Sequence, residues 1–187
     1  FDVNGLVTML FGGTSYTVPT VQVKPGEPGS TNPAGKGVEA AIQWAISIAN
    51  DDSHGYDQDI RWGPDYDCSS LIYEAFRVGG GFSLLPVHSG WTGDMVENFT
   101  KAGFNWLKGL GNDGTQLQRG DILLYHLGIN GHTAIYLGNG QIVSAHSNEF
   151  GKTKGGQTGD QTGHEIDISN YYSGPWQGIL RYSRSLV

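Results

Sequence analysis

The sequence predicts an α+β domain in which helices near its start pack on an antiparallel sheet of about five or six strands. Two observations carry this prediction. Apolar residues first recur at helical spacing between residues 37 and 78, and short strand-like apolar runs follow between residues 104 and 182. Helices grouped before a series of strands are typical of α+β proteins, in which the two kinds of element are segregated.

The expected helices have clear apolar faces. The first covers residues 37–50, and its apolar positions share one face: Val38, Ala41, Ile42, Ala45, Ile46 and Ala49. The second begins at about Cys68 and ends at Val78, because the three glycines 79–81 follow it. A short third helix is expected over residues 92–101.

The expected strands are residues 104–107, 121–127, 132–137, 141–146 and 178–182. The third and fourth form a hairpin, because Gly138-Asn139-Gly140 lies between them and is a strong turn signal. The Arg119–Asp121 step is expected to be the turn into the strand that starts at residue 121. Residues 151–163 are rich in Gly, Thr, Gln and Lys, which predicts a mobile loop.

The ends of the chain differ from its body. Residues 1–20 are expected to be extended, and residues 24–35 contain three prolines and three glycines, which is typical of a linker. We therefore expect two parts, an extended segment with its linker over 1–35 and a folded domain over 36–187. Because the chain starts with Phe1 and not Met, we expect it to be a piece of a longer protein.

The composition excludes several classes of function. The net charge of −7 argues against binding to nucleic acid or to an anionic membrane surface. No apolar run reaches the roughly 18 residues of a membrane-spanning helix. The single cysteine excludes an intrachain disulfide and argues against a thiolate-rich zinc site. We expect no metal and no cofactor.

The single cysteine, Cys68, is the candidate nucleophile. It stands at the expected start of a helix, where free N–H groups and the helix dipole stabilise a thiolate. Its neighbours Asp67, Ser69 and Ser70 are polar, which argues against the alternative of a buried structural cysteine.

His132 is the candidate base, because it follows Gly131 at the start of an apolar strand and a strand end holds the ring rigidly. His146 ends the next strand and is the candidate third member that orients His132. In a hairpin centred on residues 139 and 140, positions that sum to about 279 lie opposite each other, so His132 is expected near Ser147. Asn148 is the competing third member, and His146 is favoured over it.

Other polar residues are assigned to simpler roles. The remaining histidines are expected to be non-catalytic: His54, His88, His126 and His164. Six aspartates precede the cysteine, and a calcium site there is conceivable, but their spacing does not fit a calcium loop. A solvated acidic loop is the favoured interpretation.

Taken together, the motifs resemble those of the NlpC-type cell-wall peptidase superfamily, and within it the phage peptidoglycan hydrolases. The resemblance covers about residues 37–184. The residues that carry it are the string Gly63-Pro64-Asp65-Tyr66-Asp67-Cys68-Ser69-Ser70, the Arg119-Gly120-Asp121-Ile122 step, Gly131-His132-Thr133, and the strand that ends in His146.

The resemblance implies a papain-like core, a Cys68–His132–His146 triad, and hydrolysis of amide bonds in the peptide stems of peptidoglycan. The enzyme would be an endopeptidase or an N-acetylmuramoyl-L-alanine amidase. It also implies that Tyr56 borders the oxyanion site and that Asp67 faces the substrate. Other substrate-binding candidates around the cleft are Ser69, Trp62, Trp91 and Tyr125, although any of the three aromatic residues could instead belong to the core.

The expected location is extracellular or virion-associated, at the bacterial cell wall. The family does not explain residues 1–35, and we expect them to dock on other modules or subunits of a phage tail or lysin. Two alternatives remain open. One is a CHAP-type amidase, which usually has an acidic or Asn third residue. The other is a catalytically inactive wall-binding or virion structural module. A transglutaminase-like acyl transferase is a more remote third.

Overall fold

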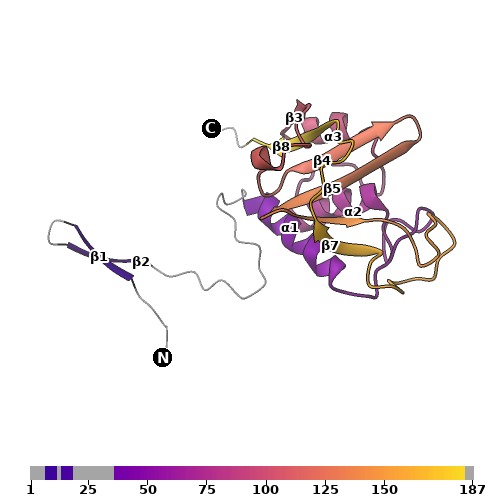
Figure 1. The fold of residues 1–187 in the computed structure, drawn as a ribbon, viewed down its shortest axis with the longest axis horizontal. Coiled ribbons are helices and arrows are strands. Elements are labelled where there is room, and N and C mark those ends of the chain that lie inside the picture. Colours follow the sequence, from indigo (N-terminus) through magenta and orange to yellow (C-terminus); the bar gives the residue numbers. More distant parts are fainter. Residues whose placement is uncertain (1–6, 12–13, 19–35, 184–187) are drawn as a thin grey trace.

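The computed structural model describes residues 7–11, 14–18 and 36–183. Within residues 36–183 the chain forms three α-helices and one six-stranded antiparallel sheet (Figure 1). The order of strands across the sheet is β3-β8-β4-β5-β6-β7. The predicted α+β class and strand number are therefore confirmed.

The helices are close to their expected positions. They are α1 (Lys36–Ala49), α2 (Cys68–Glu74) and α3 (Met95–Lys101). The second helix does not remain α-helical to Val78 as expected, because it continues as a π-helical turn over Ala75–Gly79. The third helix begins three residues later than expected. A short 3₁₀ turn covers Gly114–Gln116.

The strands of the large sheet are β3 (Phe104–Lys108), β4 (Ile122–Leu127), β5 (Asn130–Gly138), β6 (Gln141–Ala145), β7 (Ile166–Asn170) and β8 (Gly178–Tyr182). Five of them match expected strands. The sixth, β7, was not expected. It pairs with β6 along its whole length, from Gln141↔Asn170 to Ala145↔Ile166, so its partner and not its own sequence pattern defines it.

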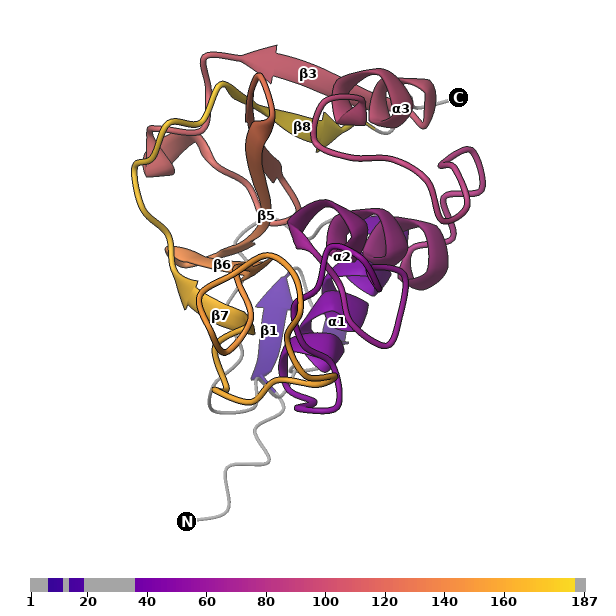
Figure 2. The ribbon, with the colours of Figure 1, turned by 90° about the vertical axis from the view of Figure 1, so that its right-hand side faces the viewer.

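The helices pack on one face of the sheet. Figure 2 shows α1 and α2 beside β5, β6 and β7, and α3 beside β3 and β8. The fully buried side chains between these layers include Ile42, Ile72, Phe76, Phe99 and Phe104. A smaller cluster contains Leu123, Ala134 and Trp176, whose strand members alternate with those of the main core along β4 and β5. Both faces of the central strands are thus buried.

The segment over residues 151–163 is tied to the domain, although the sequence predicts a mobile loop. Asp160 accepts hydrogen bonds from the backbone N–H groups of Thr162, Gly163 and Glu165. The Gly159 N–H donates to the buried carboxylate of Asp65, 94 residues away in sequence. Composition favoured mobility, but it does not reveal such carboxylate–backbone bonds.

A separate two-stranded sheet is formed by β1 (Val7–Phe11) and β2 (Thr14–Val18). This confirms the extended prediction for the described part of residues 1–20. The predicted linker over 24–35 lies outside the described residues. None of the described helices has the length and apolar character needed to cross a membrane.

Candidate active site

The candidate nucleophile lies on the first turn of α2. Asp67 is the N-cap of this helix, and its Oδ1 accepts a hydrogen bond from the Ser70 N–H at 2.7 Å. The Ser70 hydroxyl accepts one from the Asp67 N–H at 2.9 Å, which completes a capping box. Because capping satisfies N–H groups that a helix start leaves free, this local motif fixes where α2 begins and places Cys68 at that point.

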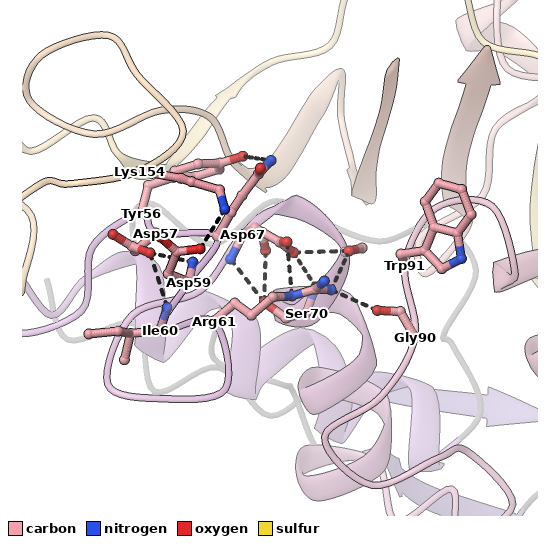
Figure 3. Close-up of polar contacts among 12 residues, drawn as sticks. Tyr56, Asp57, Asp59, Ile60, Arg61, Asp67, Ser70, Gly90, Trp91 and Lys154 are labelled. Carbon is pink, nitrogen blue, oxygen red and sulfur yellow. Dashed lines mark hydrogen bonds and ion pairs between the residues drawn. The ribbon is translucent and has the colours of Figure 1, made fainter. Parts of the chain in front are cut away.

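Arg61 holds the same carboxylate from the preceding loop. Its Nε lies 2.9 Å from Asp67 Oδ2, and one terminal nitrogen donates to the Ser69 hydroxyl and to the Gly90 carbonyl. Figure 3 shows the Arg61 side chain between Asp67 and Gly90. Asp67 is 5% exposed, so its charge is buried and needs this cationic partner. Three separate segments are joined at the nucleophile.

The thiol of Cys68 is buried and favours its protonated form. Burial, with a smaller contribution from the Asp67 carboxylate, raises its pKa to about 12, while the backbone N–H groups of Thr133 and Ser69 act in the opposite direction. The expectation that the helix start stabilises a resting thiolate is therefore wrong for this structure. The Ser69 N–H at the helix start lowers the pKa of the thiol, but loss of hydration raises it by more.

A hollow of about 210 Å³ opens beside the thiol. Four of the predicted site residues line it, namely Cys68, Asp67, Ser69 and Trp91. Trp91 is 47% exposed, with its ring edge against His126 at 4.6 Å between centroids. The other lining residues are Thr92, next to Trp91, and five from three further segments: Gln58, Arg61, Ile129, Gly131 and Lys154. Figure 3 shows Trp91 on one side of Arg61 and Lys154 on the other.

His132 lies on β5, next to the segment that faces the cysteine. Its neighbour Gly131 lines the hollow, and its other neighbour Thr133 directs its N–H toward the Cys68 thiol. The imidazole stacks on Trp176 with ring centroids 5.9 Å apart and an interplanar angle of 26°. Burial, and to a smaller extent the nearby His146, lower the pKa of His132 to about 4. The ring is therefore neutral near pH 7 and can accept a proton.

His146 directly follows the end of β6 and lies beside His132. The two imidazole centroids are 5.8 Å apart. The expected register is wrong by one residue, because an irregularity between Tyr136 and Gly138 changes the pairing to Ile135↔Val143. Continued past the end of β6, this register would place residue 146, and not 147, opposite His132.

Asn148, the competing third member, is engaged elsewhere. Its side-chain oxygen accepts hydrogen bonds from the N–H groups of Phe150 and Lys152, and its amide nitrogen donates to the Lys154 carbonyl. It is 3% exposed. These bonds give it the role of a loop anchor, which favours His146 as the neighbour of His132.

The other predicted binding residues lie at different depths. Tyr56 is 3% exposed and close enough to Cys68 for that thiol to contribute to the raised pKa of its phenol, although burial is the larger cause. Trp62 lies away from the hollow, stacked on His88 at 5.8 Å and under the Arg61 guanidinium at 4.8 Å. Tyr125 is 6.5 Å from His132, measured between ring centroids. Trp62 therefore supports Arg61 more directly than it borders the hollow.

The acidic segment before the cysteine is not a solvated loop, so that prediction is wrong for half of its aspartates. Asp57, Asp65 and Asp67 are buried, and their carboxylates accept backbone hydrogen bonds. Within the described residues, no group of three or more His, Cys, Asp or Glu side chains is arranged to hold a metal ion. These carboxylates instead hold the backbone around the cysteine through hydrogen bonds.

The residues around the site that were not identified from the sequence include Arg61, Trp176 and Asp167. A signal for Arg61 did exist, because it is the only Lys or Arg among residues 51–67 and so the natural partner for a buried aspartate there. Trp176 and Asp167 are 44 and 35 residues from His132 in sequence, and no local pattern links them to it.

Several solved structures resemble this chain at low sequence identity. The peptidoglycan hydrolase RipB of Mycobacterium tuberculosis is 21% identical, with a TM-score of 0.49, over 78% of this chain and 63% of that one. The P60 domain of an antigen from M. avium subspecies paratuberculosis is 19% identical, with a TM-score of 0.46, over 78% and 96%. NlpC1 of Trichomonas vaginalis is 16% identical, with a TM-score of 0.46, over 97% and 56%.

Sequence comparison gives the more direct assignment. No curated protein shows significant similarity to the chain. A family model described as bacteriophage peptidoglycan hydrolase matches residues 37–160, which include Cys68, His132 and His146. A second model, of an endolysin-like domain, matches residues 142–187. The predicted resemblance to phage peptidoglycan hydrolases is thus confirmed, and the chain belongs to the bacteriophage peptidoglycan hydrolase family.

Proposed function

We propose that this chain hydrolyses amide bonds in the peptide stems of bacterial peptidoglycan, with Cys68 as nucleophile and His132 as general base. Family membership supports peptidoglycan as the substrate. The observation that carries the mechanism is the position of Cys68, at the start of α2 beside an open hollow and facing the Thr133 N–H next to His132.

The neutral resting states suggest when the proton moves. Burial holds Cys68 as a thiol and His132 as a neutral imidazole. The thiol proton therefore passes to His132 as the sulfur attacks the amide carbonyl, and not before substrate binds. The Cys68 backbone N–H and the nearby Tyr56 are the proposed partners of the resulting oxyanion.

The second half of the reaction returns the enzyme to its starting state. The protonated His132 gives its proton to the leaving amine as the C–N bond breaks, which leaves a thioester on Cys68. Water then gives a proton to His132 and attacks the thioester carbonyl. The sulfur leaves and recovers its proton from His132, and the stem carboxylate is released.

Asp67, Ser69 and Trp91 line the proposed substrate site. Asp67 and Ser69 are held by Arg61, so they present fixed polar groups, whereas Trp91 is an exposed aromatic wall. We propose that the domain works at the cell wall from an extracellular or virion-associated position. Residues 1–35 would attach it to other modules.

The test is mass spectrometry of purified peptidoglycan after digestion, compared between the wild-type chain and Cys68→Ala. The wild type should produce new stem-peptide amino and carboxyl ends, and their position names the bond. An end at the lactyl–L-Ala junction identifies an amidase, and an end within the stem an endopeptidase. Cys68→Ala should produce neither while keeping the wild-type circular dichroism spectrum.

Three results would contradict the proposal. Full activity of Cys68→Ala would remove the cysteine mechanism. New sugar reducing ends with intact stems would show a glycosidase. A wild-type chain that binds the wall without cleaving any bond would support the inactive module instead.

A further inference from the structure

Asp167 on β7 lies behind the candidate third member His146. The His146 Nε2 is 2.9 Å from Asp167 Oδ1, and the Ser144 hydroxyl is 3.3 Å from the same nitrogen. Ser144 and Asp167 are direct partners in the β6–β7 ladder, and the His146 N–H donates to the Glu165 carbonyl at 2.8 Å. Two paired strands therefore fix both the backbone and the ring of His146.

A carboxylate can only accept a hydrogen bond, so the nitrogen that faces it must carry the proton. In a neutral His146 this leaves Nδ1 as the acceptor. The His132 ring lies 5.8 Å away between centroids, tilted by 32°. If His132 donates one N–H toward His146, its other nitrogen is free to accept the thiol proton of Cys68.

We propose that Asp167 is a positioning residue, which holds His146 in the Nε2–H tautomer so that His146 Nδ1 can accept a hydrogen bond from His132. This inference rests on the proposed cysteine hydrolase function. Asp167 acts through His146 and does not touch the reacting atoms. It extends the proposed triad by one residue, from β5 through the end of β6 to the edge strand β7.

A second histidine near Asp167, His164, provides a control. His164 Nδ1 lies 3.5 Å from Asp167 Oδ2, the oxygen that does not bind His146. The His164 side chain is 81% exposed, whereas those of His146 and Asp167 are 34% and 23% exposed. Two histidines thus contact one carboxylate, and only His146 adjoins His132. His164→Ala removes the other contact of Asp167 and leaves the proposed contacts from Asp167 through His146 to His132 unchanged.

The tautomer is measured directly by ¹⁵N NMR of the histidine rings in the full chain near pH 7.5, with His146→Gln used to assign the His146 signals. Wild type and His164→Ala should show His146 as the Nε2–H tautomer. Asp167→Ala should show a mixture of tautomers. Asp167→Asn keeps the size of the side chain and guards against a folding defect. Its amide can turn either its oxygen or its NH2 group toward Nε2, so its effect on the tautomer should be smaller than that of Asp167→Ala.

Activity provides the second measurement. Asp167→Ala and Asp167→Asn should lower kcat by about tenfold to a hundredfold with little change in KM, because the effect reaches His132 only through another ring. His164→Ala should keep wild-type kcat. Asp167→Glu, which restores a carboxylate, should recover part of the loss.

The proposal is overturned if wild-type His146 is the Nδ1–H tautomer, or if Asp167→Ala leaves the tautomer unchanged. It is also overturned if KM, and not kcat, carries the loss in both Asp167 variants. The NMR result does not require peptidoglycan cleavage. A fully active Cys68→Ala would therefore refute the proposed function, while an unchanged tautomer would refute the role of Asp167 alone.

Discussion

The cysteine side and the histidine side of the candidate site are built in different ways. Around Cys68, a capping box and a buried ion pair lie within ten residues of each other in sequence, from Arg61 to Ser70. Around His132, the contacts come from other strands and loops, 7 to 44 positions away, including Tyr125, His146 and Trp176. The nucleophile is thus placed by local structure, whereas the base is placed by the completed sheet.

Because of this difference, we expect substitutions on the two sides of the site to affect different properties of the protein. Changes on the cysteine side should alter the stability of one helix start and its loop. Changes on the histidine side should alter proton transfer, because we propose that these rings move the proton, and the sheet already holds their backbone.

The largest effect is expected for His132→Ala. We expect kcat/KM for peptidoglycan cleavage to fall by about a thousandfold or more, because base and nucleophile act as a unit. His126→Ala is the control, since His126 lies on the neighbouring strand β4 and pairs with Gly131. It should lose no more than a few-fold. Equal losses in both variants would show that the sheet, and not the base, had been damaged.

Asp67→Ala should mainly cost stability. It removes the α2 cap and leaves Arg61 without its buried partner, so we expect a loss of about 3 kcal/mol in the free energy of unfolding. Asp113→Ala removes the exposed cap of the 3₁₀ turn and should cost at most about 1 kcal/mol. Urea denaturation measures both. Equal losses would contradict a special role for the buried cluster.

The lowered pKa of His132 predicts a loss of stability in acid. Its pKa is about 4 in the folded chain and about 6.5 when unfolded. Between these values the unfolded state binds more protons, so stability is complete above about pH 6.5 and falls as the pH drops toward 4. The contribution of His132 should be about 2 kcal/mol between pH 7 and pH 5.

The measurement is urea denaturation at a series of pH values for wild type and His132→Gln. The variant should lack this part of the pH dependence, while the remaining acid sensitivity from the buried carboxylates stays. A His132→Gln curve parallel to that of the wild type would mean that folding leaves the pKa of His132 unchanged, which would contradict a buried, neutral ring.

The smallest effect is expected for deletion of residues 1–35. Because residues 36–183 contain the large sheet and its helices, the truncated chain should fold and cleave isolated wall fragments within about twofold of the full chain. Activity on intact cells could fall through weaker targeting. An insoluble or unfolded product would show that the amino-terminal segment completes the core.

Local patterns in the sequence predicted most of the fold. The apolar face of α1 and the short run of β8 both carry their own periodicity, and both were located to within a residue or two. The strand β7 was missed because β6 defines it by pairing. The π-helical turn after α2 was missed because an apolar face at helical spacing does not distinguish it from an α-helix.

In the site, too, residues with a local sequence pattern were identified, whereas features that depend on distant segments were missed. Cys68 and His132 were identified from motifs next to them, and their roles remain predictions. The pairing of His132 was one residue off, since a single irregularity near Tyr136 shifts the hairpin register. The direction of the Cys68 pKa was missed because burial by segments distant in sequence, unlike a helix start, has no local sequence pattern.

The buried, protonated state of Cys68 has a consequence for the durability of the protein. Oxidation to sulfenic acid begins from the thiolate and requires access to the sulfur. Cys68 is 7% exposed, and its pKa of about 12 keeps the thiolate scarce at neutral pH. A thiol that stays protonated and covered is shielded from peroxide. The same burial that raises the pKa of Cys68 therefore slows its oxidation.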